Sequence, residues 1–133
     1  MRARFLVGML LVVVVFASGG IASTGSHMSP QQWAIVNFTD PVSVYGHFLM
    51  GPVLIVHDDE KMAKGEPCTS MYRFDRADGS RTLEVEFFCT PEQRTVCEKT
   101  TFAVTRNSRT GINEMTEYQF AGDSEVHGVP SAR

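Results

Sequence analysis

The feature that most constrains the fold is a hairpin signal at Asp78–Gly79, near the middle of the segment from Cys68 to Cys89. A two-residue turn of type I′ needs positive φ at both central positions, and Asp-Gly is one of the dipeptides that supply it. With the turn placed there, the apolar residues of the second arm fall on one face, and Glu84 and Glu86 fall on the other. The predicted register pairs Phe74 with Leu83, Tyr72 with Val85, Ser70 with Phe87 and Cys68 with Cys89.

The same register predicts a disulfide. Cys68 and Cys89 fall at a pair without mutual hydrogen bonds, where Cα atoms lie about 4.5 Å apart. That separation is at the short end of the range that disulfides span. We therefore predict a Cys68–Cys89 disulfide, with two buried thiols as the alternative. Cys97 is then the unpaired cysteine. Three roles are open to it: an inert buried thiol, a disulfide to another molecule, or a nucleophile.

Residues 1–23 have the composition of a secretory signal peptide. Two arginines among the first four residues precede an apolar run over 5–17, and small residues surround a cleavage point after Ala22 or Ser23. The run is shorter than the roughly 20 residues of a membrane span, and retention as an N-terminal anchor is the alternative. In both cases we expect the domain outside the cytoplasm, in the periplasm or extracellular space of a bacterium, where disulfides persist.

Cleavage would make the chain more acidic. The full chain has 12 Lys and Arg against 15 Asp and Glu, and Arg2 and Arg4 belong to the leader. An acidic surface without a basic stripe repels phosphate backbones and anionic lipids. The sequence therefore predicts neither a nucleic acid nor a membrane as partner, and we expect a protein or a small-molecule ligand.

The rest of the chain predicts a single β domain over 33–133, after a flexible lead-in over 24–32. Outside the hairpin, strand patterns cover 33–48 with a break at Asp40–Pro41, and then 53–57, 100–106 and 112–120. The run at 53–57 is apolar on both faces, as in a central strand. The predicted fold is mainly β: an antiparallel six-strand meander, closed as a small barrel or a curled sheet, with two short connecting helices.

The two helices are predicted from their capping residues. Residues 58–65 have acids first, lysines late and Gly65 at the end, an order that suits one capped turn. Thr90 to Gln93 has the layout of a capping box, with proline at the first helical position, and predicts a helix to about Cys97. Residues 122–133, which include His127, are predicted to be a polar tail.

The candidate site residues gather around the end of the buried strand at 53–57. His57 ends this strand, and Met62 follows on a helical turn from which its thioether could fold back toward the imidazole. Soft sulfur with imidazole favours copper, so His57, Met62 and His127 form a candidate copper site, and Asp58 and Asp59 extend the possible binding surface. The alternative is structural, with His57 bonded to backbone and Met62 filling the core.

Two segments carry a resemblance. They are residues 57–69, HDDEKMAKGEPCT, and residues 118–130, YQFAGDSEVHGVP. In these segments the chain resembles a group of small exported bacterial proteins of unknown function. The resemblance implies an exported bacterial protein, and it implies no activity, ligand or site.

The sequence is compatible with three functions. The leading hypothesis is a non-enzymatic exported β domain that binds a partner or small ligand, without a cofactor. The first alternative is a copper-binding protein that uses His57, Met62 and His127. The second is a thiol-dependent enzyme that uses Cys97 as the nucleophile.

Overall fold

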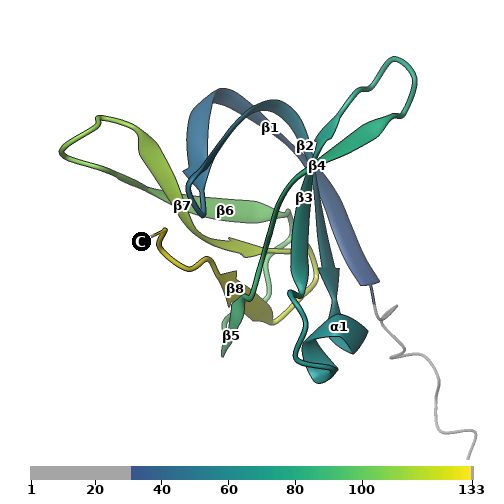
Figure 1. Cartoon of the computed structure of the whole chain (residues 1–133). Coiled ribbons are helices and arrows are strands. Elements are labelled where there is room, and N and C mark those ends of the chain that lie inside the picture. Colours follow the sequence, from purple (N-terminus) through teal and green to yellow (C-terminus); the bar gives the residue numbers. More distant parts are fainter. Residues whose placement is uncertain (1–30, 133) are drawn as a thin grey trace, which may run out of the picture.

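The computed structural model describes residues 31–132, and the predicted signal peptide lies outside the described residues. The described chain is mainly β, as predicted, and it folds as one open, curled sheet with the shape of a half-barrel (Figure 1). The first strand begins at Gln31, so the predicted lead-in extends two residues too far. Among residues 31–132, no helix is both long and apolar enough to cross a membrane.

The described part of the chain contains eight strands and one short helix, in place of the predicted six strands and two helices. The elements are β1 (Gln31–Val44), β2 (His47–Asp58), α1 (Asp59–Ala63), β3 (Thr69–Phe74), β4 (Arg81–Phe87), β5 (Thr90–Gln93), β6 (Thr101–Arg106), β7 (Asn113–Gln119) and β8 (Glu125–Gly128). Their order in the sheet is β4-β3-β2-β1-β7-β8-β5, with β6 also paired to β7. The meander prediction is wrong, because β1 pairs with β7 in parallel across the middle of the sheet.

The type I′ conformation occurs at Tyr45–Gly46, inside a segment that was predicted to be one strand. Val44 pairs with His47, and the two residues between them have φ values of 48° and 82°. Positive φ at both positions is what a two-residue hairpin turn requires. Earlier in the chain, within β1, the predicted break at Asp40–Pro41 is a bulge, where the register shifts between Phe38 and Val42. A bulge bends the strand, which contributes to the curl of the sheet.

The Asp78–Gly79 hairpin forms, but with a longer loop and a different register. Four residues lie between Asp75 and Ser80, whose backbone groups are hydrogen-bonded at 2.9 Å, and the Asp75 carboxylate accepts from the amide of Ala77 at 2.8 Å. These side-chain contacts stabilise the wider loop. A further shift pairs Met71 with Val85 and Tyr72 with Leu83. Leu83 therefore lies on the outer face and is 49% exposed.

The second predicted helix is a strand. Residues Thr90 to Gln93 form β5, which pairs with β8 at the edge of the sheet. Pro91 is tolerated there because an edge strand leaves one row of backbone groups unpaired. The predicted polar tail at 122–133 supplies β8, so His127 is a strand residue. By contrast, α1 follows the prediction, with Asp58 as its N-cap.

The core fills the concave side of the curled sheet. It is formed by residues of β1–β4 and β7 and the residue after β7: Val36, Phe38, Val42, Val44, Leu49, Val53, Ile55, Met71, Val85, Phe87, Met115, Tyr118 and Phe120. The second half of β2 lies between β1 and β3, as predicted for a central strand. The curl brings β2 and β8 to face each other, although two strands separate them in the sheet.

We expect Gly46→Ala to lower the free energy of unfolding by about 1–2 kcal/mol. Gly46 has φ 82°, and an added Cβ would lie 3.1 Å from the Cβ of Ala132. The matched control is Gly79→Ala, which has φ 72° in open space and should lose about 1 kcal/mol from backbone strain alone. Urea denaturation of both variants measures the difference. Equal losses would show that the chain near Ala132 moves aside without cost.

Candidate functional site

His57 lies at the end of β2, on the concave side of the sheet. Its neighbour Asp58 caps α1, and the backbone amide of Asp58 donates to the carbonyl of Cys68 at 2.9 Å. His57 is fully buried, with 0% exposure, and both of its ring nitrogens have no hydrogen-bond partner. The nearest acidic group is Asp59, whose Oδ1 lies 3.4 Å from Nδ1. Burial lowers the pKa of His57, so the ring is neutral at pH 7.

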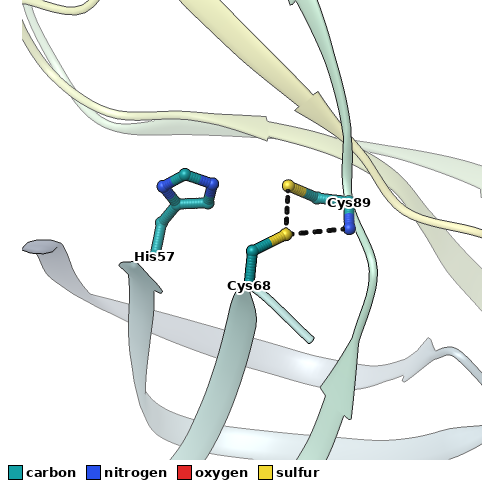
Figure 2. A group of neighbouring side chains, drawn as sticks. All are labelled: His57, Cys68 and Cys89. Carbon is teal, nitrogen blue, oxygen red and sulfur yellow. Dashed lines mark hydrogen bonds between the residues drawn. The ribbon is translucent and has the colours of Figure 1, made fainter. Parts of the chain in front are cut away.

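Cys68 and Cys89 point toward each other beside this ring (Figure 2). Cys68 precedes β3 and Cys89 follows β4, so both lie beyond the hairpin ladder. Their Sγ atoms are 2.8 Å apart, and the backbone amide of Cys89 donates to the Sγ of Cys68 at 3.2 Å. The predicted proximity is therefore confirmed, whereas the disulfide is not formed and both residues are free thiols. Burial, followed by the contact with Cys68, raises the pKa of the Cys89 thiol to about 12.

These three side chains form a compact group of metal-ligand type. One ring nitrogen of His57 and the sulfurs of Cys68 and Cys89 all lie within 4.8 Å of one another. The three residues come from the end of β2, the connection before β3 and the β4–β5 connection, and their side chains converge on one small volume (Figure 2). His57 and Cys68 are buried and Cys89 is partly exposed.

His127 brings a second imidazole to the group from β8. It is fully buried, its ring centroid lies 4.2 Å from that of His57, and its Nδ1 lies 3.7 Å from the Sγ of Cys89. Its Nε2 has no hydrogen-bond partner. Burial, reinforced by the neighbouring His57, lowers the pKa of His127 to about 4. The two histidines of the predicted copper site are therefore brought together, because β8 pairs with β7 and places His127 opposite Tyr118.

Two acidic side chains lie near the ring nitrogens of His127, beyond hydrogen-bond distance. Asp123 Oδ2 is 3.7 Å from Nε2, and Glu125 Oε1 is 3.7 Å from Nδ1. Burial raises the pKa of Glu125. Carboxylates at this distance from an imidazole can orient the ring and increase its basicity once a ligand binds the other nitrogen.

Aromatic rings close the site on the side of β7. The Tyr118 ring stacks on His127 with centroids 5.0 Å apart, and the ring of Phe120 packs edge-on at 5.9 Å. The hydroxyl groups of Tyr118 and Thr69 are hydrogen-bonded to each other, which links β7 to β3. Burial raises the pKa of Tyr118 well above its usual range, so the phenol stays protonated.

The other predicted residues lie outside this group. Met62 lies on α1 and is partly exposed, and the sulfurs grouped with His57 are those of the two cysteines. Asp58 uses Oδ1 to accept from the amides of Glu60 and Lys61 at 2.9 and 3.1 Å, and its Oδ2 accepts from Gln31 at 2.9 Å. It is therefore a capping residue, and of the two aspartates only Asp59 faces the imidazole.

Cys97 lies apart from the two cysteines of the site. Its thiol donates to the carbonyl of Phe120 at 3.3 Å and is partly buried. The sulfur that faces His127 belongs to Cys89. The contact of His127 is thus with Cys89, and the contact of Cys97, the nucleophile of the enzyme alternative, is with a backbone carbonyl.

Sequence reasoning missed Cys68 and Cys89 as candidate metal ligands because it assigned both sulfurs to a disulfide. The available signal was the short spacing of His57 and Cys68 around a capped helical turn, which returns the chain to the same end of the sheet. Comparisons with protein-family models, with curated proteins and with solved structures each gave no significant match.

Proposed function

We propose that this chain is an exported, non-enzymatic β domain that binds one thiophilic metal ion, Cu⁺ or Zn²⁺. The proposed ligands are the thiolates of Cys68 and Cys89 and the imidazole of His57, with His127 as the fourth ligand of a four-coordinate ion. One observation carries the proposal: two cysteine sulfurs converge on the buried His57, neither of whose ring nitrogens has a hydrogen-bond partner, and one of these sulfurs contacts Nδ1 of the buried His127.

The unpartnered nitrogens favour a ligand role over a structural one. Both nitrogens of His57 and Nε2 of His127 are buried without a hydrogen bond. Each such group destabilises a fold by about 1–3 kcal/mol, and native proteins keep few of them. A purely structural histidine would bond to backbone or to another side chain. Coordination of a metal ion satisfies a ring nitrogen and offsets this cost.

The distances suit a metal ion after a small adjustment. With Zn–S of about 2.3 Å and Zn–N of about 2.0 Å, two sulfurs of a tetrahedral site lie about 3.8 Å apart, and a sulfur and a nitrogen lie about 3.5 Å apart. The distance of 3.7 Å between Cys89 Sγ and His127 Nδ1 is close to the second value. The two sulfurs, now 2.8 Å apart, would need to separate by about 1 Å. Side-chain rotation can supply such a movement, since both cysteines lie in connections between strands.

The number of imidazole ligands distinguishes the two metals. Two thiolates with one imidazole make a soft, three-coordinate set that suits Cu⁺, whereas two thiolates with two imidazoles make the tetrahedral set typical of Zn²⁺. His127 is the residue that decides between them. In both cases the ion replaces the thiol protons, including that of Cys89 with its raised pKa, because a coordinated thiol is deprotonated.

Burial supports a binding role over catalysis. A catalytic metal site keeps one coordination position open to substrate, but His57, Cys68 and His127 are buried and aromatic rings cover His127. The signal-peptide pattern of residues 1–23, and the resemblance to small exported bacterial proteins, support a place outside the cytoplasm.

The test is a metal titration of the full chain, reduced and kept free of oxygen, with Zn²⁺ and with Cu⁺ against a competing chromophoric chelator. We expect one ion per chain. Cys68→Ser and Cys89→Ser should each weaken binding at least 100-fold, and Cys97→Ser should leave it unchanged. His57→Leu, which removes both unpartnered nitrogens at similar volume, should weaken binding, and His47→Ala is the matched control because His47 is exposed.

Two results would oppose the proposal. Binding that survives Cys68→Ser and Cys89→Ser would place the ion elsewhere, and an absence of binding at micromolar metal would remove the function. Circular dichroism of each variant shows that loss of binding is not loss of fold. His127→Leu then assigns the metal: a fall in Zn²⁺ affinity of more than tenfold indicates the four-coordinate site, and unchanged Cu⁺ affinity indicates the three-coordinate one.

A further inference from the structure

We infer that Cys68 and Cys89 form a reversible dithiol–disulfide pair that controls the metal site: the ion binds the reduced pair, and closure of the disulfide releases it. This inference rests on the proposed function, because it describes how that same site is regulated. The observation that carries it is the position of the two sulfurs, which share one site with His57 while contacting each other.

The sulfur separation is intermediate between the two states. A disulfide needs the sulfurs about 2.05 Å apart, and two thiolates on one tetrahedral ion lie about 3.8 Å apart. The observed distance of 2.8 Å lies between these values, within about 1 Å of each. The same two atoms cannot serve both states at once. Oxidation therefore removes both sulfur ligands and leaves only the imidazoles of His57 and His127.

The chain permits the exchange without unfolding. Cys68 and Cys89 lie outside the strand ladders, immediately before β3 and in the connection between β4 and β5. The backbone amide of Cys89 donates to the Sγ of Cys68. Such a donor stabilises a thiolate, and therefore the reduced, metal-bound form. Closure of the disulfide would instead link the same two segments covalently, so that either state ties the two ends of the β3–β4 hairpin together.

The burial of the two sulfurs determines the order of the exchange. Cys68 is 3% exposed and Cys89 is partly exposed, so a small disulfide such as oxidised glutathione can reach only Cys89 directly. The Cys89 sulfur attacks the reagent, forms a mixed disulfide and releases one glutathione thiol. The Cys68 sulfur then attacks Cys89 and releases the second. Two electrons pass from the protein sulfurs to the reagent. In the metal-free pair the two thiol protons pass to the two glutathione thiolates. In the metal-bound pair, whose thiolates carry no protons, the glutathione thiolates take protons from water and the ion leaves with its charge unchanged.

The experiment equilibrates the full chain at fixed ratios of reduced to oxidised glutathione and measures two quantities in each sample. Alkylation and mass spectrometry count the free thiols, and chelator competition measures Zn²⁺ and Cu⁺ affinity. We expect three thiols and one bound ion at the reducing end. At the oxidising end we expect one thiol, located at Cys97 by peptide mapping, and an affinity at least 100-fold weaker. Cys97→Ser should keep the same midpoint with zero thiols when oxidised.

The outcomes separate this inference from the function on which it rests. If the oxidised chain keeps three thiols, pairs Cys97, or binds metal as tightly as the reduced chain, the switch is wrong and metal binding stands. If the reduced chain binds neither ion, the proposed function fails and control of a metal site fails with it. The thiol count then still shows whether Cys68 and Cys89 close a disulfide.

Discussion

Tyr118→Ala is expected to lower the free energy of unfolding by about 4 kcal/mol, a large part of the stability of a domain of this size. Tyr118 is fully buried, its ring packs against Phe120 and His127, and its hydroxyl bonds to Thr69. Removal of the ring leaves a cavity between β7, β8 and the start of β3, and it leaves the Thr69 hydroxyl buried without this partner. Urea denaturation monitored by circular dichroism gives the value.

Two further variants separate packing from hydrogen bonding in this prediction. Tyr118→Phe keeps the ring and removes the hydroxyl, and should lower the free energy of unfolding by about 1–2 kcal/mol. Phe48→Ala removes an aromatic ring that is 61% exposed and should change it by less than about 0.5 kcal/mol. If Tyr118→Ala were no more destabilising than Phe48→Ala, the two halves of the sheet would not depend on contacts across the concave side.

Acidification of the metal-free protein from pH 7 to pH 4 is expected to destabilise the fold by roughly 3 kcal/mol through His127 alone. The pKa of this residue falls from 6.5 in the unfolded chain to about 4 in the fold, because burial disfavours the charged ring. Below pH 6.5 the unfolded state therefore binds the proton first. The stabilisation is complete above pH 6.5 and is lost as the pH falls toward 4.

The groups that face His127 modify this slope without reversing it. His57 has a pKa lowered by the same cause and adds to the loss. Glu125 has a raised pKa and acts in the opposite sense, since its folded form takes up a proton first.

The measurement is urea denaturation at several pH values in the presence of a chelator, with His127→Leu as the matched variant. We expect the variant to show a shallower decline between pH 6.5 and 4. Equal stability of the unmodified protein at pH 7 and pH 4 would contradict the prediction. It would mean that His127 takes up its proton as readily in the fold as in the unfolded chain, which would also weaken its assignment as a metal ligand. A bound ion should protect the fold in this interval until protons displace it from the thiolates.

Local chemistry accounts for what the sequence predicted correctly. The capped turn after His57 needs only Asp58 and the following backbone amides, which lie within three residues of it. The central position of the strand at 53–57 follows from its apolar residues on both faces. The proximity of Cys68 and Cys89 followed from a hairpin with ends symmetric about its turn, and it persists although the register inside the hairpin differs.

Long-range pairing decided the rest. The residues Thr90–Gln93 satisfy a capping pattern, but β8 offers them a sheet edge, and the pairing with residues more than 30 positions away determines a strand. Tyr45–Gly46 turns the chain because β1 and β2 pair along most of their length, and this holds a tyrosine at positive φ. Neither competition is visible in a window of neighbouring residues.

The sequence by itself determined the mainly β class, the helix cap and the closeness of two cysteines, because each depends on periodicity or on groups near each other in the chain. Only the tertiary structure decided that His57 and His127 meet and that the two cysteine sulfurs share their site. These residues lie on β2, β8 and two connections, and the curl of the sheet brings them together (Figure 1). The physical reason is that burial on one concave side, rather than spacing along the chain, selects which polar side chains become neighbours.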